Sequence, residues 1–556
     1  MKNIQASLVD FIKSTGKIFL KVNWENFFLV VLIVISPFLV YYNLGINPRT
    51  WHDEGASLSI PKTLVEDGVY AMRSSDGYQT FGAVQSVGPT LTLPIALVYK
   101  YFGVGLLQGR LVSASYALIT LWVFFFAGYY LFGKRVALLA VGFMLGSPAA
   151  GYLLNGRQVL GEAPAIGFFL AGWLAWAVGV NKNKKGLYFL AGLFLGLAMI
   201  TKSQYMILGM ATLGLLVILD FFYYRQKVYG WLIVMGTIAV ACVAGWYAWQ
   251  INYFGMDVFR ENAAKMGVLA KSTLGLNLHS FIEAVRFLLG SGSGHFYFFW
   301  SWPALLYVGF LSFKRDRQGL VLSFLTLFTI LWILYFSFWI IPWFRYFFPA
   351  AVLTALFVAK LFFDLADGLK ASGQGLWDEI RQIDLKSSFA LPSWSLIYMG
   401  TLAGLLTMVF GLAYQLQKVV RSDVLDTYGA DEILNSSPPQ FYAPQEVVNF
   451  LNQNIEKGKV IETWERELGV LTDHNYHYPD QVMLAQVHLH LYRGGDNVYG
   501  LGDEYFMQAQ PDYLVIGWYS RLNNIYDLNA VEKLGERIAT FGSGEWRYDV
   551  YKITIP

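Results

Sequence analysis

The sequence predicts a polytopic α-helical membrane protein with an α/β domain outside the membrane at its C-terminal end. Three observations predict this class. The 556 residues are 56% hydrophobic and only 14% charged, whereas a soluble domain carries about 25% charge. Long apolar runs recur between residues 25 and 415. They stop at about residue 416, where charged and apolar residues begin to mix. We therefore divide the chain into a membrane domain, 1–415, and an extracytoplasmic domain, 416–556.

The apolar runs predict the membrane spans, since each span needs about 20 mostly apolar residues and cytoplasmic loops collect Lys and Arg. On these rules the chain crosses the membrane about eleven times. The predicted spans are residues 25–43, 110–132, 136–153, 164–180, 187–202, 203–223, 229–254, 296–312, 319–340, 349–365 and 394–415. Lysines before the first span place the N-terminus in the cytoplasm and the C-terminal domain outside an inner cell membrane.

The run 87–105 is apolar but contains two prolines and a lysine. If it crossed the membrane, Lys134 and Arg135 would face outside, against the positive-inside tendency. We therefore expect it to lie parallel to the membrane, together with the shorter run 57–66, within a first outer loop at 44–109. A true crossing remains the alternative, because the tendency is not a strict rule.

The C-terminal domain has the alternating helical and strand-like stretches of an α/β domain. Residues 443–454 begin with a Pro and a Glu, as many helices do. Residues 459–463 and 513–517 are short apolar runs typical of buried strands. Residues 546–553 alternate, which predicts an edge strand that closes the domain.

The charged residues of the membrane domain gather at span ends that we predict to lie outside. They are Asp53, Glu54, Arg110, Arg157, Glu162, Lys202 and Arg345. An ion-coupled transporter would need ionisable groups or broken helices near the midplane. Charges of both signs at one face instead favour chemistry at the outer interface. The net charge of +3 gives no sign of a nucleic-acid partner.

The stretch Trp51-His52-Asp53-Glu54-Gly55 follows the first span closely and carries two adjacent carboxylates. Charge near a bilayer is costly and is usually kept for function. The simpler interpretation is the first turn of a helix, where acidic residues are favourable.

Three further motifs have both a functional and a structural interpretation. Arg157 and Glu162 flank a short outer loop, but Glu162 also suits the start of a helix. Arg345 and Tyr346 lie at the outer mouth of a span, where an aromatic belt with a snorkelling Arg is the alternative. Lys202 lies in an outer turn, where the positive-inside tendency disfavours it.

The charged residues at the predicted outer face suit the transfer of a sugar from a lipid carrier, because nucleotide sugars are absent outside the membrane. A polyprenyl-phosphate sugar places an anionic phosphate at headgroup depth. We expect Arg110, Arg157, Lys202, Arg345, Tyr346 and His52 to bind substrate, the basic groups stabilising the leaving phosphate. A carboxylate such as Asp53 or Glu162 would deprotonate an acceptor hydroxyl, and one displacement inverts the anomeric centre. The same two carboxylates could hold a divalent cation.

The order of these motifs resembles the GT-C superfamily of integral-membrane glycosyltransferases. The motifs are Asp53-Glu54, Arg110, Gly156-Arg157…Glu162-Ala163-Pro164 and Arg345-Tyr346…Pro349. Within the superfamily the chain resembles the protein O-mannosyltransferase and lipid A aminoarabinose transferase branch. Residues 461–473, Ile461-Glu462-Thr463-Trp464-Glu465 to Asp473, resemble the outer domain of bacterial members.

The resemblance implies membrane-parallel helices in the first outer loop, polyprenyl-phosphate-sugar donors and inversion. It implies Asp53 as the base, Glu54 and Glu162 as further acidic members of the site, and Arg110 and Arg345 as ligands of the donor phosphate. The sugar and the acceptor, whether glycan, lipid or protein, stay open. A lipid-linked-sugar flippase or other transporter is the alternative, and a receptor whose outer domain senses a ligand is another.

Overall fold

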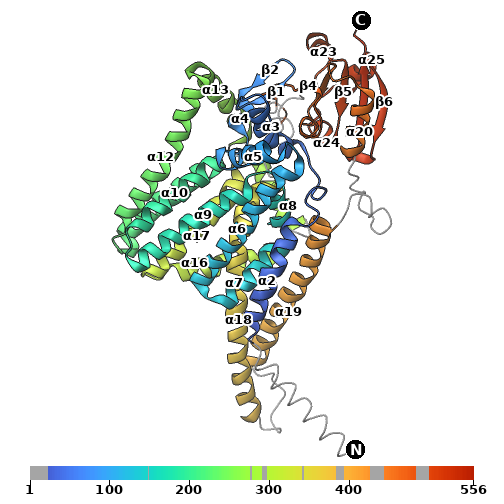
Figure 1. Cartoon of the computed structure of the whole chain (residues 1–556). Helices are drawn as coiled ribbons and strands as arrows, with labels where there is room; N and C mark the ends of the chain where they lie inside the picture. Colours follow the sequence, from blue (N-terminus) through green and yellow to red (C-terminus); the bar gives the residue numbers. More distant parts are fainter. Residues whose placement is uncertain are drawn as a thin grey trace, which may run out of the picture.

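The structure is a computed structural model that describes residues 23–147, 150–275, 278–290, 297–340, 343–382, 393–425, 444–483, 487 and 500–555. The chain forms a helix bundle with a sheet domain at one end (Figure 1). In the described residues, eight helices are long and apolar enough to cross a membrane, and Gly186–Thr201 is a shorter apolar helix. The chain is thus an integral, multi-pass membrane protein, as predicted.

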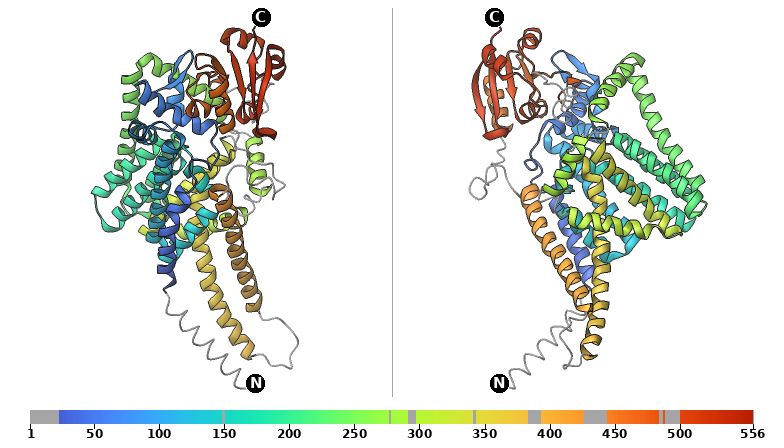
Figure 2. Two further views of the ribbon diagram at one scale, coloured as in Figure 1. Left: turned by 45° about the vertical axis from the view of Figure 1, so that its right-hand side comes forward. Right: turned by 180° about the vertical axis from the view of Figure 1, so that it is seen from behind.

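Each predicted span contains a helix. The helices are α2 (Trp24–Tyr41), α6 (Leu106–Phe132), α7 (Lys134–Gly146), α9 (Glu162–Lys182), α10 (Gly186–Thr201), α11 (Ser203–Leu219), α12 (Tyr229–Phe254), α16 (Trp302–Ser312), α17 (Arg317–Phe338), α18 (Phe348–Gln382) and α19 (Ser393–Val420). The number of actual crossings stays a prediction. In both views of Figure 2 the long α18 projects from the end of the bundle opposite the sheet domain.

Two stretches differ from the sequence-based expectation. The predicted span 136–153 is not one helix, because α7 ends at Gly146 and a separate short helix, α8, covers Tyr152–Arg157. The predicted outer loop that begins at residue 255 is largely helical, with α13 at Met256–Thr273 and α14 at Leu278–Gly290. The α13 helix is amphipathic and carries several charges, so an apolarity search for spans passes over it.

The first outer loop contains the two predicted short helices. They are α3 (His52–Glu66) and α5 (Pro89–Phe102). Between them lie an antiparallel hairpin of β1 (Met72–Ser74) and β2 (Gly77–Gln79) and the helix α4 (Thr80–Gln85), which the sequence patterns did not indicate. The α3 helix lies between the bundle and the sheet domain (Figure 1).

The C-terminal domain contains a five-stranded mixed sheet of order β4-β3-β5-β7-β6. The strands are β3 (Val460–Thr463), β4 (Asn475–His477), β5 (Tyr513–Ile516), β6 (Gly535–Phe541) and β7 (Tyr548–Ile553), and the longest helix among its described residues is α20 (Pro444–Asn454). Strands β3, β4 and β5 are parallel, and β7 and β6 run antiparallel to their neighbours. The prediction of an edge strand at 546–553 is wrong, because β7 pairs on both sides and β6 forms the edge.

Successive side chains of β5 point to opposite faces of the sheet, and both faces are covered. Leu514 and Ile516 join a buried cluster with Trp464 and Val531 on one face. Val515 joins a second cluster with the helix α20 on the other. A strand buried on both faces is apolar throughout, as the sequence of β5 is.

Helix α3 is packed directly against the loop that follows β3. Gly55 touches the backbone of Arg466 and Glu467 so closely that a Cβ would overlap both residues. Farther along the helix, Lys62 Nζ donates to the carbonyl oxygens of Gly469 (3.0 Å) and Thr472 (3.2 Å). The same Nζ lies 2.8 Å from a carboxylate oxygen of Asp473. The C-terminal domain therefore helps to fix the position of α3.

Replacing Gly55 with Ala should destabilise the protein by about 1–3 kcal/mol, because the added methyl group forces α3 away from a rigid backbone. Thermal unfolding of the purified protein in detergent measures this. A methyl group added at Gly245 in α12 would meet no atom within 4 Å, so Gly245→Ala is the matched control and should not lower the unfolding temperature. Equal behaviour of the two variants would contradict the tight contact.

Candidate functional site

A polar cavity of about 150 Å³ lies where α3, the bundle and the C-terminal domain meet. The first outer loop, the bundle and the C-terminal domain all contribute to its polar lining. The lining includes His52 and Asp53 of α3, Gln85 of α4, Lys202 at the start of α11, Arg345 and Tyr346 of the short helix η3 (Phe344–Phe347), and Gln481 and Tyr519 of the C-terminal domain. The site thus depends on the whole chain being folded.

The centre of the cavity is an ion pair between Asp53 and Arg345. Their side chains are 18% and 17% exposed. Arg345 also lies over the rings of Trp51, Trp343 and Tyr346, at 5.4, 5.5 and 5.1 Å from the ring centroids. Burial raises the pKa of Asp53 above the ordinary range of a carboxyl, and the charges of Arg345 and Lys202 oppose that rise.

A second ion pair adjoins the first. Lys202 Nζ lies 2.9 Å from Glu162 Oε1, and both side chains are largely buried. Gly161 precedes Glu162 with a φ of 81°, a left-handed conformation that lets α9 begin at Glu162. Glu162 is close enough to influence the pKa of Asp53. The structure therefore brings Asp53, Glu162, Lys202, Arg345 and Tyr346 together, as the sequence analysis expected.

A larger, mostly apolar cavity of about 550 Å³ adjoins the polar one. The two cavities share Leu160, Trp343 and Arg345. Four tryptophans line the larger cavity, namely Trp51, Trp343, Trp518 and Trp546. Trp518 and Trp546 are stacked at 4.2 Å, and the guanidinium of Arg49 lies 4.0 Å over Trp546. Arg345 therefore stands at the boundary between a polar space and an aromatic one.

The fold of the chain is similar to that of known membrane proteins. Residues 86–249 match the family model described as dolichyl-phosphate-mannose-protein mannosyltransferase. The crystal structure of ArnT from Cupriavidus metallidurans in the apo state is similar over 97% of this chain and 98% of that chain, with a TM-score of 0.58 at 14% identity. The same protein bound to undecaprenyl phosphate gives 0.57 at 14% identity over 96% and 98%.

The chain has the GT-C fold. The archaeal oligosaccharyltransferase AglB from Archaeoglobus fulgidus, in complex with an inhibitory peptide and a dolichol-phosphate, is also similar. The similarity covers 96% of this chain and 75% of that chain, with a TM-score of 0.53 at 12% identity. No curated protein matches the chain by sequence. The fold that the resemblance implies is confirmed by these structures.

The structure corrects the roles expected of Glu54 and Arg110 in the candidate site. Arg110 Nε and Nη2 donate to the two Glu54 carboxylate oxygens at 2.8 and 2.6 Å, and both side chains are 0% exposed. The backbone amide of Val159 also donates to Glu54, and Arg110 also donates to the carbonyl oxygen of Leu44. Because neither side chain lines the polar cavity, the pair holds the first outer loop on α6 and does not reach a substrate there.

Arg157 is corrected in the same way. Its guanidinium is fully buried and donates to the carbonyl oxygens of Leu39 (2.6 Å), Tyr42 (2.6 Å) and Asn47 (2.8 Å). Carbonyls at a helix C-terminus attract a cation, so Arg157 caps α2 from the side. It does not line the polar cavity, where the sequence analysis expected it to bind substrate.

His52 lines the cavity, but not as a cation. Its Nδ1 lies 2.5 Å from the carbonyl oxygen of Trp464, so Nδ1 carries the hydrogen and donates. Its ring stacks on Tyr519 at 4.0 Å. Burial, together with the nearby charges of Arg466 and Arg345, lowers the pKa of His52 well below its usual value. At neutral pH it is an uncharged contact between α3 and the C-terminal domain.

Asp53 and Glu162, the two carboxylates expected to be able to hold a divalent cation, are poorly suited to bind it. Asp53 is paired with Arg345 and Glu162 with Lys202, so each carboxylate already faces a cation. Within the described ranges, three or more His, Cys, Asp or Glu side chains nowhere gather as a metal site would require. We therefore derive no step through a metal ion.

Sequence reasoning missed the contributions of Gln85, Gln481 and Tyr519. Each is far from the acidic motif in the chain and belongs to a residue type that is common on surfaces. The ETWER stretch of residues 462–466 was the available signal, since it adjoins α3 through Trp464 and Arg466.

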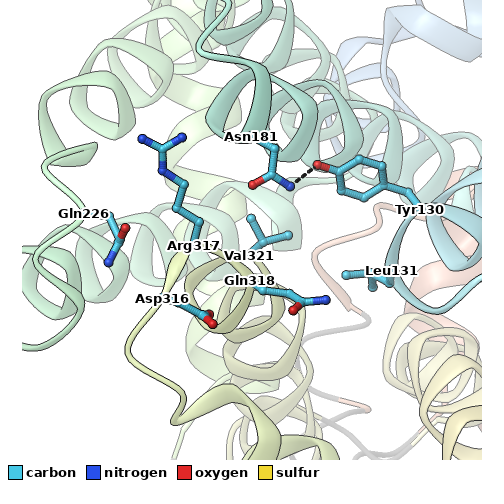
Figure 3. Close-up of a pocket in the computed structure, with 8 residues that line it drawn as sticks. All are labelled: Tyr130, Leu131, Asn181, Gln226, Asp316, Arg317, Gln318 and Val321. Atoms are coloured by element: carbon cyan, nitrogen blue, oxygen red, sulfur yellow. Dashed lines mark hydrogen bonds between the residues drawn. The ribbon is translucent and has the colours of Figure 1, made fainter.

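Another cavity, of about 490 Å³, lies at the far end of the bundle. Tyr130, Asn181 and Arg317 line it, and Asn181 donates to the Tyr130 hydroxyl (Figure 3). Tyr130 is 20 residues along α6 from Arg110, about 30 Å at the helical rise of 1.5 Å per residue. This cavity is therefore separate from the site around Asp53.

The neighbouring carboxylates should differ in their response to loss of charge. Glu54→Gln leaves Arg110 buried without its counter-charge, which costs about 3–5 kcal/mol. Asp53→Asn disturbs a pair that is partly exposed, so its loss of stability should be clearly smaller. Thermal unfolding and the yield of monodisperse protein in detergent measure both. If Asp53→Asn were the more damaging change, the assignment of Glu54 to structure would be wrong.

Proposed function

We propose that the chain is an inverting glycosyltransferase that moves a sugar from a polyprenyl-phosphate donor to an acceptor hydroxyl. The observation that carries this proposal is the Asp53–Arg345 ion pair at the junction of a polar and an apolar cavity. The relatives support the donor class, because ArnT was solved with undecaprenyl phosphate and AglB with a dolichol-phosphate. We further propose that the site lies on the outer face of an inner cell membrane, with the N-terminus in the cytoplasm.

In the proposed reaction, Arg345, Lys202 and Tyr346 bind the donor phosphate. Arg345 and Lys202 already lie in the polar cavity and face carboxylates. A phosphate that approaches Arg345 competes with Asp53 for the guanidinium, which frees the carboxylate of Asp53. Positive charge around the leaving phosphate stabilises the negative charge that builds up as the bond to the sugar breaks.

Asp53 is the proposed general base. Its carboxylate accepts the proton of the acceptor hydroxyl as the hydroxyl oxygen bonds to the anomeric carbon. The bond between the anomeric carbon and the phosphate oxygen breaks, and its electrons leave with the polyprenyl phosphate. A base with a raised pKa holds the proton better than an exposed aspartate does, and burial raises that of Asp53. A single displacement inverts the configuration at the anomeric carbon.

Two alternatives make different demands. A flippase needs a polar path across the membrane, whereas the polar cavity is located at one end of the bundle, beside α3. A receptor would leave the charged residues scattered, whereas Asp53, Glu162, Lys202 and Arg345 form two adjoining ion pairs. Both observations favour the transferase proposal.

Asp53→Asn should lower transfer by about 10²–10⁴-fold, the usual contribution of a general base. The assay follows the release of polyprenyl phosphate from a radiolabelled polyprenyl-phosphate sugar in proteoliposomes that contain membrane extract as acceptor. Asp257→Asn, on the exposed surface of α13, is the control and should retain activity. Chelation with EDTA should leave the rate unchanged. Full activity in the Asp53 variant would remove it as the base.

The pH dependence of transfer should report the same carboxylate. Asp53 acts in its ionised form, so activity falls as the pH drops through its pKa. Arg345 and Lys202 hold that pKa down, so Arg345→Gln should move the acid limb of the rate profile to higher pH, besides slowing the reaction. Lys134→Gln, at the start of α7, should not move the limb. An unchanged or lower acid limb in Arg345→Gln would contradict the coupling.

A further inference from the structure

Arg466 is a fully buried arginine that the proposed reaction does not use. Its side chain is 1% exposed. Nη1 lies 2.9 Å from the sulfur of Met72, and Nη2 lies 3.5 Å from Oε1 of Gln79. The rings of Tyr478 and Trp464 lie 4.9 and 5.8 Å from the guanidinium carbon. All of these partners are neutral.

The other buried arginines of this region have partners that match their charge. Arg110 is paired with Glu54, Arg345 with Asp53, and Arg157 with carbonyls at a helix end. No carboxylate of the described residues lies within ion-pair distance of Arg466. Asp480 acts on Arg466 from farther away, but it is 58% exposed and faces Lys265 at 3.5 Å. A buried ion without a counter-ion costs several kcal/mol.

Burial lowers the pKa of Arg466 to about 10, so the guanidinium still carries its charge at neutral pH. The cost of a buried charge is therefore present in the unliganded protein. Residues that lower stability in this way are commonly kept for function.

Arg466 lies directly behind one wall of the Asp53 cavity. Gln481 and Gln85 belong to that wall. With the amide of Gln481 oriented to satisfy its neighbours, its oxygen accepts from Nη1 and Nη2 of Arg466 at 3.2 and 3.1 Å, and its nitrogen donates to Gln85. The amide oxygen of Gln481 thus lies between two guanidinium nitrogens. A carboxylate or phosphate oxygen occupies this position in a charge-assisted contact with arginine.

We propose that Arg466 forms an oxyanion subsite at the Gln85–Gln481 wall of the cavity, and that Gln481 occupies the subsite when no substrate is present. The ligand is a phosphate or carboxylate group. The ion pairs Asp53–Arg345 and Lys202–Glu162 are each balanced, so among the described residues of the cavity and this wall Arg466 is the cation that faces neutral groups and that a ligand could match.

The location of Arg466 indicates which substrate carries this group. Arg345 and Lys202 come from the bundle, and the proposed function assigns them to the donor phosphate. Arg466 and Gln481 come from the C-terminal domain. Resting on that proposed function, the inference is that the acceptor is anionic and that the C-terminal domain recognises its charge.

Binding of inorganic phosphate to the purified full-length protein tests the subsite without any transfer reaction. Thermal unfolding is followed against phosphate concentration, with chloride at equal ionic strength as the reference. The wild type should show a saturable rise in unfolding temperature. Arg466→Gln should weaken the apparent affinity about tenfold or more, the usual loss for a charged hydrogen-bond partner. Met72→Leu, which changes a neutral contact of the same guanidinium, is the matched control and should respond as the wild type does.

Gln481→Glu provides the sharpest comparison. It places a carboxylate of the same shape against Arg466, so it should raise the unfolding temperature without phosphate and remove the phosphate response. Gln481→Ala should keep the response. A normal phosphate response in both Arg466→Gln and Gln481→Glu would overturn the subsite.

Saturating undecaprenyl phosphate separates the two possible sources of the anion. If the acceptor carries it, the wild type still responds to inorganic phosphate when the lipid is bound. Loss of that response would overturn the assignment to the acceptor. If Arg466→Gln does not fold, Arg466→Lys replaces it, and a phosphate affinity unchanged by that variant counts against the subsite. A chain that bound phosphate in this way but transferred no sugar would refute the proposed function and leave the subsite intact.

Discussion

Helix α3 is held from two sides, and the position of the site depends on that constraint. On the bundle side, Glu54 forms a completely buried bidentate pair with Arg110. On the domain side, Gly55 lies against the backbone after Trp464, and Lys62 reaches three oxygens of residues 469–473. Asp53 lies between these contacts and points to Arg345. The carboxylate is therefore positioned by both domains at once, which is the preorganisation that the proposed catalysis requires.

The buried charges around α3 divide into two kinds. Those with complete partner sets, Glu54, Arg110 and Arg157, hold elements together and are closed to a ligand. Those at the cavities, Asp53, Lys202 and Arg345, are held in simple ion pairs, and in the proposed reaction a charged ligand replaces their partners. Arg466 belongs to a third situation, in which a neutral amide occupies the place of an anion. Burial alone therefore does not distinguish a structural charge from a candidate functional one. The groups that each charge contacts make that distinction.

The sequence was informative where a pattern depends on the membrane or on a short local motif. Every predicted span contains a helix because a long apolar run in a lipid environment has to satisfy its backbone internally. The hairpin β1–β2 and helix α13 were missed because their sequences are short or polar and gain stability from contacts with other segments. The strand at the C-terminus was placed at the sheet edge because its alternation does not reveal whether one or two neighbours pair with it.

By itself, the sequence determined a membrane protein with an acidic motif after its first span, since composition and charge cost are local properties. Only the tertiary structure decided which member of that motif is accessible. Asp53 and Glu54 are adjacent on a helix, so their side chains point about 100° apart. One consequently faces Arg345 in the cavity, and the other is buried against Arg110. The stretch from Trp51 to Gly55 is thus both the proposed catalytic element and the joint between two domains. It can have both roles because adjacent residues of a helix point in different directions.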